Sequence, residues 1–202
     1  MEPSNPLNDA LWEEVITVAR SASDHYSMTE EQQRVLFDIY PGGTIVELGV
    51  CNGKTALVLA AAAWSCGFGY LKRCPGRYIG IDNWGLENTY EGVKALMEAA
   101  RLWGGNSYLI NGSTHTPHLP DSLRPIDLLV IDAGHDEANV SIDCERWTPM
   151  VRPGGYVAFH DYDEPADPDS PHWAVRHYAD KYTGSWKHVG YWDGLLIRQR
   201  PV

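Results

Sequence analysis

Acidic and imidazole side chains follow two short apolar segments in the second half of the chain. Ile126–Ile131 is followed directly by Asp132, with His135 three residues further on, and Tyr156–Phe159 is closely followed by Asp161. If the segments are neighbouring parallel strands, their carboxyl ends meet at one edge of the sheet and the two carboxylates converge there. Two such oxygen ligands suit Mg²⁺ or another divalent cation. With an ordinary pKa of about 6.5, His135 could take a proton from a hydroxyl group.

A glycine turn lies earlier in the chain, in the stretch Val46–Thr55 (VELGVCNGKT). A phosphate-binding loop needs about four residues between its first glycine and Gly-Lys-Thr, but only three separate Gly49 from Gly53. The dinucleotide pattern G-x-G-x-x-G also fails, because Cys51 and Lys54 stand at its second and third glycine positions. A nucleotide hydrolase built on this Gly-Lys-Thr stays open as a hypothesis that requires one more loop residue.

The composition excludes several classes of partner. The 202-residue chain has 44% hydrophobic residues and a formal net charge of −11, so neither nucleic acid nor an anionic membrane is expected as its main partner. The longest apolar run, Ala56–Trp64, is about half of a membrane span. The four cysteines show no CxxC pair, and the start MEPSNPLNDA is unlike a signal peptide. We therefore expect a soluble cytoplasmic protein.

The elements that position these residues alternate along the chain. From residue 44 onward, short apolar segments alternate with amphipathic ones, which predicts an α/β fold with a doubly wound, mostly parallel, seven-stranded sheet. Residues 1–43 are expected to form an N-terminal helical cap on the core at 44–202, in one compact domain, and the pattern from Thr29 to Gln32 predicts a capping box. The expected strands are 44–48, 77–81, 107–110, 126–131, 156–159, 186–191 and 195–199, and the expected later helices are 54–65, 89–103, 138–150 and 173–182.

Three motifs together resemble the class I S-adenosylmethionine (SAM)-dependent methyltransferases. They are VELGVCNGKT, IDLLVIDAGHD and RPGGYVAFHDYD, in this order, and the resemblance covers about residues 44–200. It points to the small-molecule O-methyltransferase branch that includes macrolide-sugar and cephamycin-pathway enzymes. The resemblance implies a Rossmann-like methyltransferase fold and methyl transfer from SAM to a hydroxyl of a small molecule. The chain departs from the family's G-x-G-x-G, because Cys51 replaces the middle glycine.

The resemblance also implies a cofactor site spread along the strand ends. The glycine loop would lie against the methionine part of SAM, with no Cβ in the way of the backbone. One acidic residue would face the ammonium group, a second would accept hydrogen bonds from the ribose hydroxyls, and a polar turn would lie near the adenine. The glycine loop contains Gly49, Cys51 and Gly53. Glu47 would face the ammonium group, and Asp82 would bind the ribose. Gly112 and Ser113 would lie near the adenine, and Asp132 would also lie next to the cofactor.

The same resemblance assigns metal and catalytic roles. Asp132 and Asp161 match two positions that hold a divalent cation in the resembled enzymes, where the cation binds a hydroxyl pair of the acceptor. The third position is acidic there and is His160 here. The D-x-x-H spacing matches the general base of sugar methyltransferases, so His135 and Asp132 are the predicted catalytic residues. Alternatively, His135 is a helix N-terminal residue hydrogen-bonded to Asp132 or Asp136, and a protonated His160 replaces the metal.

The residues also permit a protein without a metal or without catalysis. The chain could be a metal-independent methyltransferase that acts on nitrogen, or a module that binds SAM without chemistry. The acidic, proline-rich stretch at 163–171 is either a lid or a solvated connection. The N-terminal helices either cap the acceptor pocket or form a contact between copies in a homo-oligomer.

Overall fold

A seven-stranded sheet organises the part of the chain that the computed structural model describes, which is residues 6–20, 28–68, 76–84, 90–115, 119, 124–162 and 169–202. The strand order is β3-β2-β1-β4-β5-β7-β6; the first five strands of the chain run parallel, and β7 runs antiparallel to both of its neighbours. This confirms the predicted doubly wound sheet, with an antiparallel hairpin at one edge. The strands are β1 Thr44–Leu48, β2 Arg77–Asp82, β3 Ser107–Asn111, β4 Ile126–Ile131, β5 Val151–Phe159, β6 Lys187–Trp192 and β7 Leu195–Gln199.

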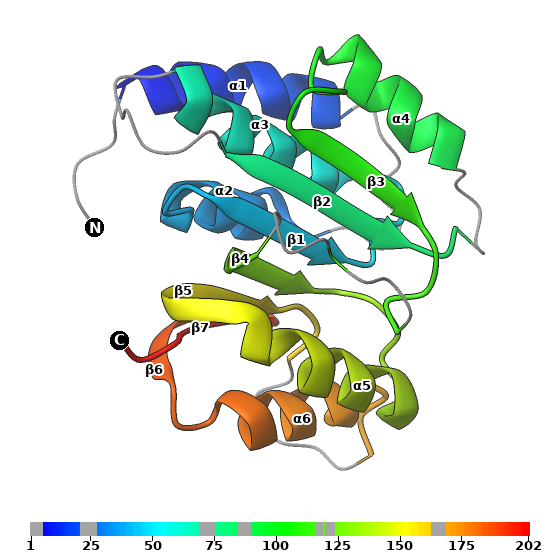
Figure 1. Cartoon of the computed structure of the whole chain (residues 1–202), viewed down its shortest axis with the longest axis vertical. Helices are drawn as coiled ribbons and strands as arrows, with labels where there is room; N and C mark the ends of the chain where they lie inside the picture. The colour runs from blue at the N-terminus through cyan, green and yellow to red at the C-terminus, as the bar shows by residue number, and fades with distance from the viewer. Residues whose placement is uncertain are drawn as a thin grey trace.

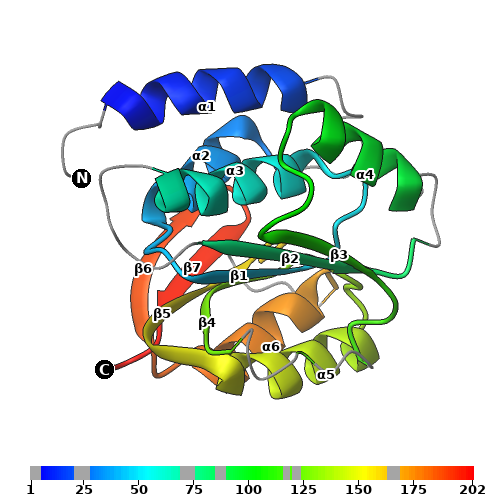
Figure 2. The same cartoon turned by 45° about the horizontal axis from the view of Figure 1, so that its top comes forward.

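Helices cover both faces of the sheet (Figures 1 and 2). One face carries α1 to α4 and the other carries α5 and α6, so the molecule has three layers and two hydrophobic cores. None of the described helices is long and apolar enough to cross a membrane. The helices are α1 Pro6–Ala19, α2 Glu30–Ile39, α3 Lys54–Phe68, α4 Tyr90–Ala99, α5 Glu137–Trp147 and α6 Trp173–Thr183.

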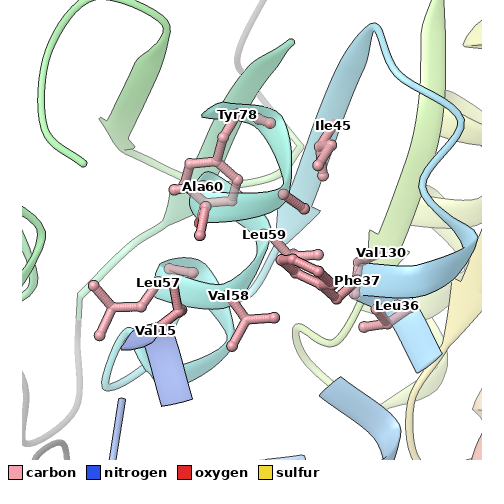
Figure 3. Close-up of a cluster of buried hydrophobic side chains, with 14 of the residues drawn as sticks. Val15, Leu36, Phe37, Ile45, Leu57, Val58, Leu59, Ala60, Tyr78 and Val130 are labelled. Atoms are coloured by element: carbon pink, nitrogen blue, oxygen red, sulfur yellow. The ribbon is translucent and has the colours of Figure 1, made fainter. Parts of the chain in front are cut away.

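The first core forms around α3, which is apolar on nearly all sides. This helix packs on the sheet and also on α1 and α2, so its residues Ala56–Ala63 are all buried. A helix that is hydrophobic all round needs partners on every side. The N-terminal helices therefore share one core with the sheet, while the domain boundary at residue 43 stays a prediction. Figure 3 shows side chains of α3 together with Val15 of α1, Leu36 and Phe37 of α2, and Ile45, Tyr78 and Val130 of the sheet.

Some element boundaries differ from the expected ones. The helix expected at 89–103 ends at Ala99, and Arg101 takes a left-handed backbone with φ 58°. The helix expected at 138–150 ends at Trp147 and passes into a 3-10 turn, because Pro149 lacks the N–H that an α-helix needs there. Strand β5 starts at Val151, before the expected position, because Val151 already pairs with Ile126 of β4 ahead of a register shift.

Asp127, the one polar residue of the apolar segment Ile126–Ile131, links the starts of three strands. Its carboxylate accepts a hydrogen bond from Thr44 N of β1 at 2.7 Å and another from the Arg152 side chain of β5. Gly43 sits so close that an added Cβ would lie 1.9 Å from Asp127 Oδ2. These contacts fix the relative positions of β1, β4 and β5 at their amino ends, and the pairing carries that alignment to their carboxyl ends.

The predicted capping box at the start of α2 is confirmed and has a second function. Thr29 Oγ1 accepts from Gln32 N at 3.2 Å, and Gln32 Oε1 accepts from Thr29 N at 2.8 Å. The Gln32 amide also donates to the carbonyls of Trp192 and Asp193, at 3.1 and 2.7 Å. The buried Gln32 side chain therefore joins the N-terminal helices to the turn between β6 and β7.

We expect Gln32→Ala to lower the free energy of unfolding by about 2 kcal/mol, because it removes one side of the capping box and the donor to the carbonyls of Trp192 and Asp193. Thr29→Ala, which removes only the cap, should cost about 1 kcal/mol. Urea unfolding of both variants measures the difference. Equal losses would show that the bonds to Trp192 and Asp193 add nothing.

Candidate active site

The hydrogen-bond ladder of the sheet continues one residue beyond the carboxyl ends of the central strands. Asp132 N donates to the carbonyl of Leu48 at 2.9 Å, and His160 N donates to the carbonyl of Ile131 at 3.1 Å. Asp132 and His160 therefore occupy matching positions after β4 and β5. This is the edge toward which the strand arrows of β1 to β4 point (Figure 1).

Four predicted site residues meet at this edge: Asp132, His135, His160 and Asp161, here called the His/Asp cluster. His160 Nδ1 lies 2.9 Å from Asp132 Oδ1 and 3.2 Å from Asp161 Oδ2. His135 Nε2 lies 3.0 Å from the same Asp161 oxygen and 4.0 Å from Asp132 Oδ1. The convergence predicted from the sequence is present in the structure, and the roles of these residues stay predictions.

The pKa values within the cluster follow from this arrangement. Interactions with Asp132 and then Asp161 raise the pKa of His135 to about 9, against the opposing effect of burial. Burial alone would lower the pKa of His160, but the same two carboxylates outweigh it and raise that pKa to about 10. Burial would likewise raise the pKa of Asp161, yet the two imidazoles hold it well below its usual range. Without a metal, both rings therefore keep a proton at neutral pH.

His172 belongs to the surroundings of this cluster, although no spacing pattern along the chain pointed to it. It lies just before α6, with Nδ1 3.9 Å from Asp161 Oδ1, and its ring is edge-on to His135 with centroids 5.0 Å apart. Asp161 has a left-handed backbone with φ 56°, which places its carboxylate beside three imidazoles. Only the packing of α6 brings His172 here, because its five-residue spacing from His177 matches no ligand pattern.

The structure gives α5 a cap other than His135. Asp136 Oδ1 accepts hydrogen bonds from Ala138 N and Asn139 N, both at 3.1 Å. His135 precedes this cap, and its ring is directed at Asp161 and Asp132. His135 therefore lies just before the N-terminus of α5 without capping it, and both its predicted catalytic role and the alternative of a helix-terminal residue bound to Asp132 stay predictions.

The glycine loop after β1 keeps its left-handed shape despite Cys51. The φ angles of Gly49, Cys51 and Gly53 are 88°, 50° and 82°. An added Cβ would lie 2.0 Å from the carbonyl oxygen of Asp132 at Gly49 and 2.6 Å from Val93 Cγ1 at Gly53. Both glycines are thus required by the packing of the loop against β4 and α4, a reason that the sequence pattern did not reveal.

Asp82 holds the glycine loop through its backbone. Asp82 Oδ2 accepts from Val50 N and Cys51 N, both at 2.8 Å, and Oδ1 accepts from Trp84 N at 2.7 Å. A carboxylate has about four lone-pair sites, so roughly one remains for a ligand, on Oδ1. The indole Nε1 of Trp84 is buried and has no hydrogen-bond partner among the described residues, so it is a donor available to a ligand.

Glu47 lies under the same loop and is almost fully buried, at 1% exposure. Its carboxyl accepts a short hydrogen bond from the hydroxyl of Tyr78, and burial raises its pKa well above the usual range. The charges of Asp132 and Asp82 add to that rise. Three acidic side chains therefore border the loop, an environment that favours a bound cation and disfavours a phosphate.

The polar turn after β3 is anchored to α5. The carbonyl of Thr114 accepts from Trp147 Nε1 at 3.0 Å, and Ser113 Oγ accepts from His115 N at 3.1 Å, which is a local turn contact. At Gly112 an added Cβ would meet no atom of the described residues within 4 Å. Most of the predicted lid at 163–171 lies outside the described residues.

Residues 46–162, more than half of the chain, match the family described as a methyltransferase domain. The chain belongs to this methyltransferase family. The match covers the glycine loop and all four residues of the His/Asp cluster. It replaces the nucleotide-hydrolase hypothesis, which the acidic surroundings of the loop also disfavour.

Solved structures share the fold of this methyltransferase at low sequence identity. NovP, an O-methyltransferase, is 14% identical with a TM-score of 0.67, covering 98% of this chain and 99% of that one. The O-methyltransferase TomG from Streptomyces achromogenes, in complex with SAM, is 15% identical with a TM-score of 0.61, covering 98% and 91%. CalS11, a TDP-rhamnose 3'-O-methyltransferase of calicheamicin biosynthesis, is 15% identical with a TM-score of 0.62, covering 98% and 96%. No curated protein matches the chain by sequence.

We expect Asp82→Ala to destabilise the methyltransferase by about 2 kcal/mol or more, because three backbone N–H groups lose a charged acceptor. Asp82→Asn keeps one acceptor oxygen, so it should cost clearly less. Urea unfolding measures both effects. If Asp82→Ala unfolds like the native chain, the carboxylate does not hold the loop.

The metal-free cluster predicts how stability depends on pH. The pKa values of His135 and His160 lie above the ordinary 6.5 in the folded state, so their contribution is complete below about pH 6.5 and is lost as the pH rises through about 9 to 10. The lowered pKa of Asp161 acts in the acid range, where its contribution is lost as the pH falls below about 3.8. Unfolding in EDTA at about pH 6, 7.5 and 9 measures the alkaline loss. In Asp161→Asn, stability should fall less steeply as the pH rises. If stability falls equally steeply with pH in the variant and the native chain, the loss does not come from the interaction of Asp161 with the two imidazoles.

Proposed function

We propose that this protein transfers the methyl group of SAM to a hydroxyl group of a small molecule. The observation that carries the proposal is the contact between the glycine loop and the His/Asp cluster. A Cβ added to Gly49 would lie 2.0 Å from the backbone oxygen of Asp132, whose side chain belongs to the cluster. A donor held by the loop and an acceptor held by the cluster would therefore be neighbours.

Several features support SAM as the methyl donor. The three acidic residues at the loop, Glu47, Asp82 and Asp132, suit a ligand that carries a sulfonium and an ammonium charge. The remaining acceptor site of Asp82 is a polar contact for a ribose, and so is the indole N–H of Trp84, which has no hydrogen-bond partner among the described residues. Gly112, where an added Cβ would meet no described residue within 4 Å, is the position that we assign to the adenine side. TomG, which shares this fold, is described in complex with SAM.

The cluster supports a hydroxyl group as the acceptor. CalS11, which shares the fold, acts on the 3' hydroxyl of TDP-rhamnose, and we take a hydroxylated molecule of this kind as the substrate class. Asp132, His160 and Asp161 would hold a divalent cation, Mg²⁺ or another, since their ligand atoms all lie within 4.8 Å of one another. A bound cation would lower the pKa of a coordinated hydroxyl and stabilise the developing alkoxide.

The chain's own residues then orient the reaction. His135 Nε2, placed 3.0 Å from Asp161, would take the proton of the acceptor hydroxyl. The acceptor oxygen forms a bond to the methyl carbon while the carbon–sulfur bond breaks, so the products are the methyl ether and S-adenosylhomocysteine. Because the sulfonium is already a good leaving group, most of the protein's contribution is the in-line positioning of the two reactants. His135 can take the hydroxyl proton only when its ring is neutral. This requires a weaker interaction of the ring with Asp132 and Asp161, because these carboxylates raise its pKa.

The experiment is a turnover assay that measures S-adenosylhomocysteine, with TDP-rhamnose and simple phenols as acceptors. We expect His135→Ala to lower kcat by about 10²–10⁴-fold while SAM binding, measured by calorimetry, is unchanged. His188→Ala is the matched control, because this exposed histidine of β6 lies outside the cluster.

Two results would contradict the proposal. If SAM does not bind, the donor is wrongly assigned. If His135→Ala turns over as fast as the control, the imidazole is not the base.

A further inference from the structure

The distances between ligand atoms in the His/Asp cluster are similar to those between ligands of one metal ion. His160 Nδ1 is 2.9 Å from Asp132 Oδ1 and 3.2 Å from Asp161 Oδ2. Ligand atoms about 2.0–2.2 Å from a common ion, at angles near those of a tetrahedron or octahedron, lie roughly 3–3.5 Å apart. The two contacts of His160 have this spacing, and all three ligand atoms lie within 4.8 Å of one another.

Hydrogen bonding alone leaves these atoms incompletely satisfied. The Nδ1 atom of His160 carries at most one proton, yet it lies between two carboxylate oxygens. The Nε2 atom of His135 is buried, and it makes no well-aligned hydrogen bond to any described residue in spite of its 3.0 Å distance to Asp161. One cation between Asp132, His160 and Asp161 would satisfy all three ligand atoms at once. The side chains are positioned for this, because those of Asp132 and His160 are only 14% exposed and that of Asp161 is 25% exposed.

The donor set also restricts which cation fits. Mg²⁺ prefers oxygen ligands and keeps most of its water, whereas imidazole nitrogen suits Zn²⁺, Fe²⁺ and the other first-row transition ions. A third carboxylate in place of His160 would give an all-oxygen site. We infer that His160 makes this a site for a divalent transition metal and sets its preference over Mg²⁺. This inference rests on the proposed function for its catalytic meaning, but the binding of metal does not depend on methyl transfer.

The neighbouring imidazoles belong to a second group of possible ligands, because the ligand atoms of His135, Asp161 and His172 also lie within 4.8 Å of one another. His135 approaches Asp161 Oδ2 at 3.0 Å but stays 4.0 Å from Asp132 Oδ1, so it borders the site on one side only. His172 is 3.9 Å from the other oxygen of Asp161 and packs edge-on against His135. Both rings therefore lie beside the Asp161 carboxylate, where outer partners of metal ligands are commonly found. Three protein ligands would leave room on a bound ion for the hydroxyl of an acceptor.

The experiment measures metal binding by the full chain, treated with chelator and then dialysed, in the absence of SAM and acceptor. Titration with Co²⁺, followed by its visible absorption, and with Zn²⁺ and Mg²⁺, followed by calorimetry, gives the three affinities. We expect one transition ion per chain, bound at least about 100-fold more tightly than Mg²⁺. Because transition ions bind most sites more tightly than Mg²⁺, the decisive quantity is how this ratio changes in a variant.

The deciding variant is His160→Asp, which restores an all-oxygen site of similar reach. Its ratio of Co²⁺ to Mg²⁺ affinity should fall at least about tenfold, with Mg²⁺ bound more tightly than by the native chain. The control His188→Ala should keep the native ratio, and far-ultraviolet circular dichroism shows that each variant is folded. An unchanged ratio in folded His160→Asp, or no Co²⁺ binding by the native chain, overturns the inference. If the chain transfers methyl groups but binds no metal, the metal inference is wrong and methyl transfer from SAM still stands. If it binds metal but not SAM, the proposed function is wrong and the metal inference still stands.

Discussion

The close approach of two backbones, the glycine loop after β1 and the end of β4, is the constraint on which the site depends. Gly49 has no Cβ, and for that reason its backbone can lie against the carbonyl of Asp132. Any other residue would push the loop away from the strand and would also need a left-handed backbone at φ 88°. The contact sets the distance between the loop, which would hold the donor, and the cluster, which would hold the acceptor. A displacement of about an ångström between reactants is enough to slow a reaction strongly.

The parallel pairing of β1, β4 and β5 fixes the geometry of that contact. Asp127 ties the amino ends of these strands together, and the ladder extends past their carboxyl ends to Asp132 and His160. Residues that are far apart in the chain therefore reach hydrogen-bond distance with rigid backbones behind them. A site built on strand ends is held more precisely than one on free loops, which suits a reaction that relies on orientation.

Charge is concentrated at this edge for a physical reason. Carboxylates that are close together in a partly buried place repel one another and need cations nearby. At the loop, the cationic cofactor proposed here would balance the charges of Asp82 and Asp132, and it would favour a charge on Glu47, which burial alone disfavours. At the cluster, the balancing charges are protonated imidazoles in the metal-free state, and a metal ion in the state that we infer. The raised pKa values of His135 and His160 follow from two carboxylates that favour positive charge at this position.

The sequence by itself determined the fold class and predicted which residues meet in the His/Asp cluster. Buried strands such as Ile126–Ile131, the capping box at Thr29 and the alternation of elements are local patterns, and local patterns report backbone preference and burial directly. The three motifs also indicated the methyltransferase family, which the family match confirmed. Helix ends were less accurate, since the end at Ala99 and the turn at Pro149 depend on a few weak interactions.

Only the tertiary structure decided how those residues meet. It brought His172 to Asp161 through the packing of α6, and it showed that Gly49 and Gly53 are small because β4 and α4 crowd them. It also showed that Asp82 uses most of its hydrogen-bonding capacity on the loop itself and that Asp136, not His135, caps α5. No spacing along the chain encodes these facts, because contacts between distant segments depend on strand order and helix docking. Those are settled by the packing of the whole core.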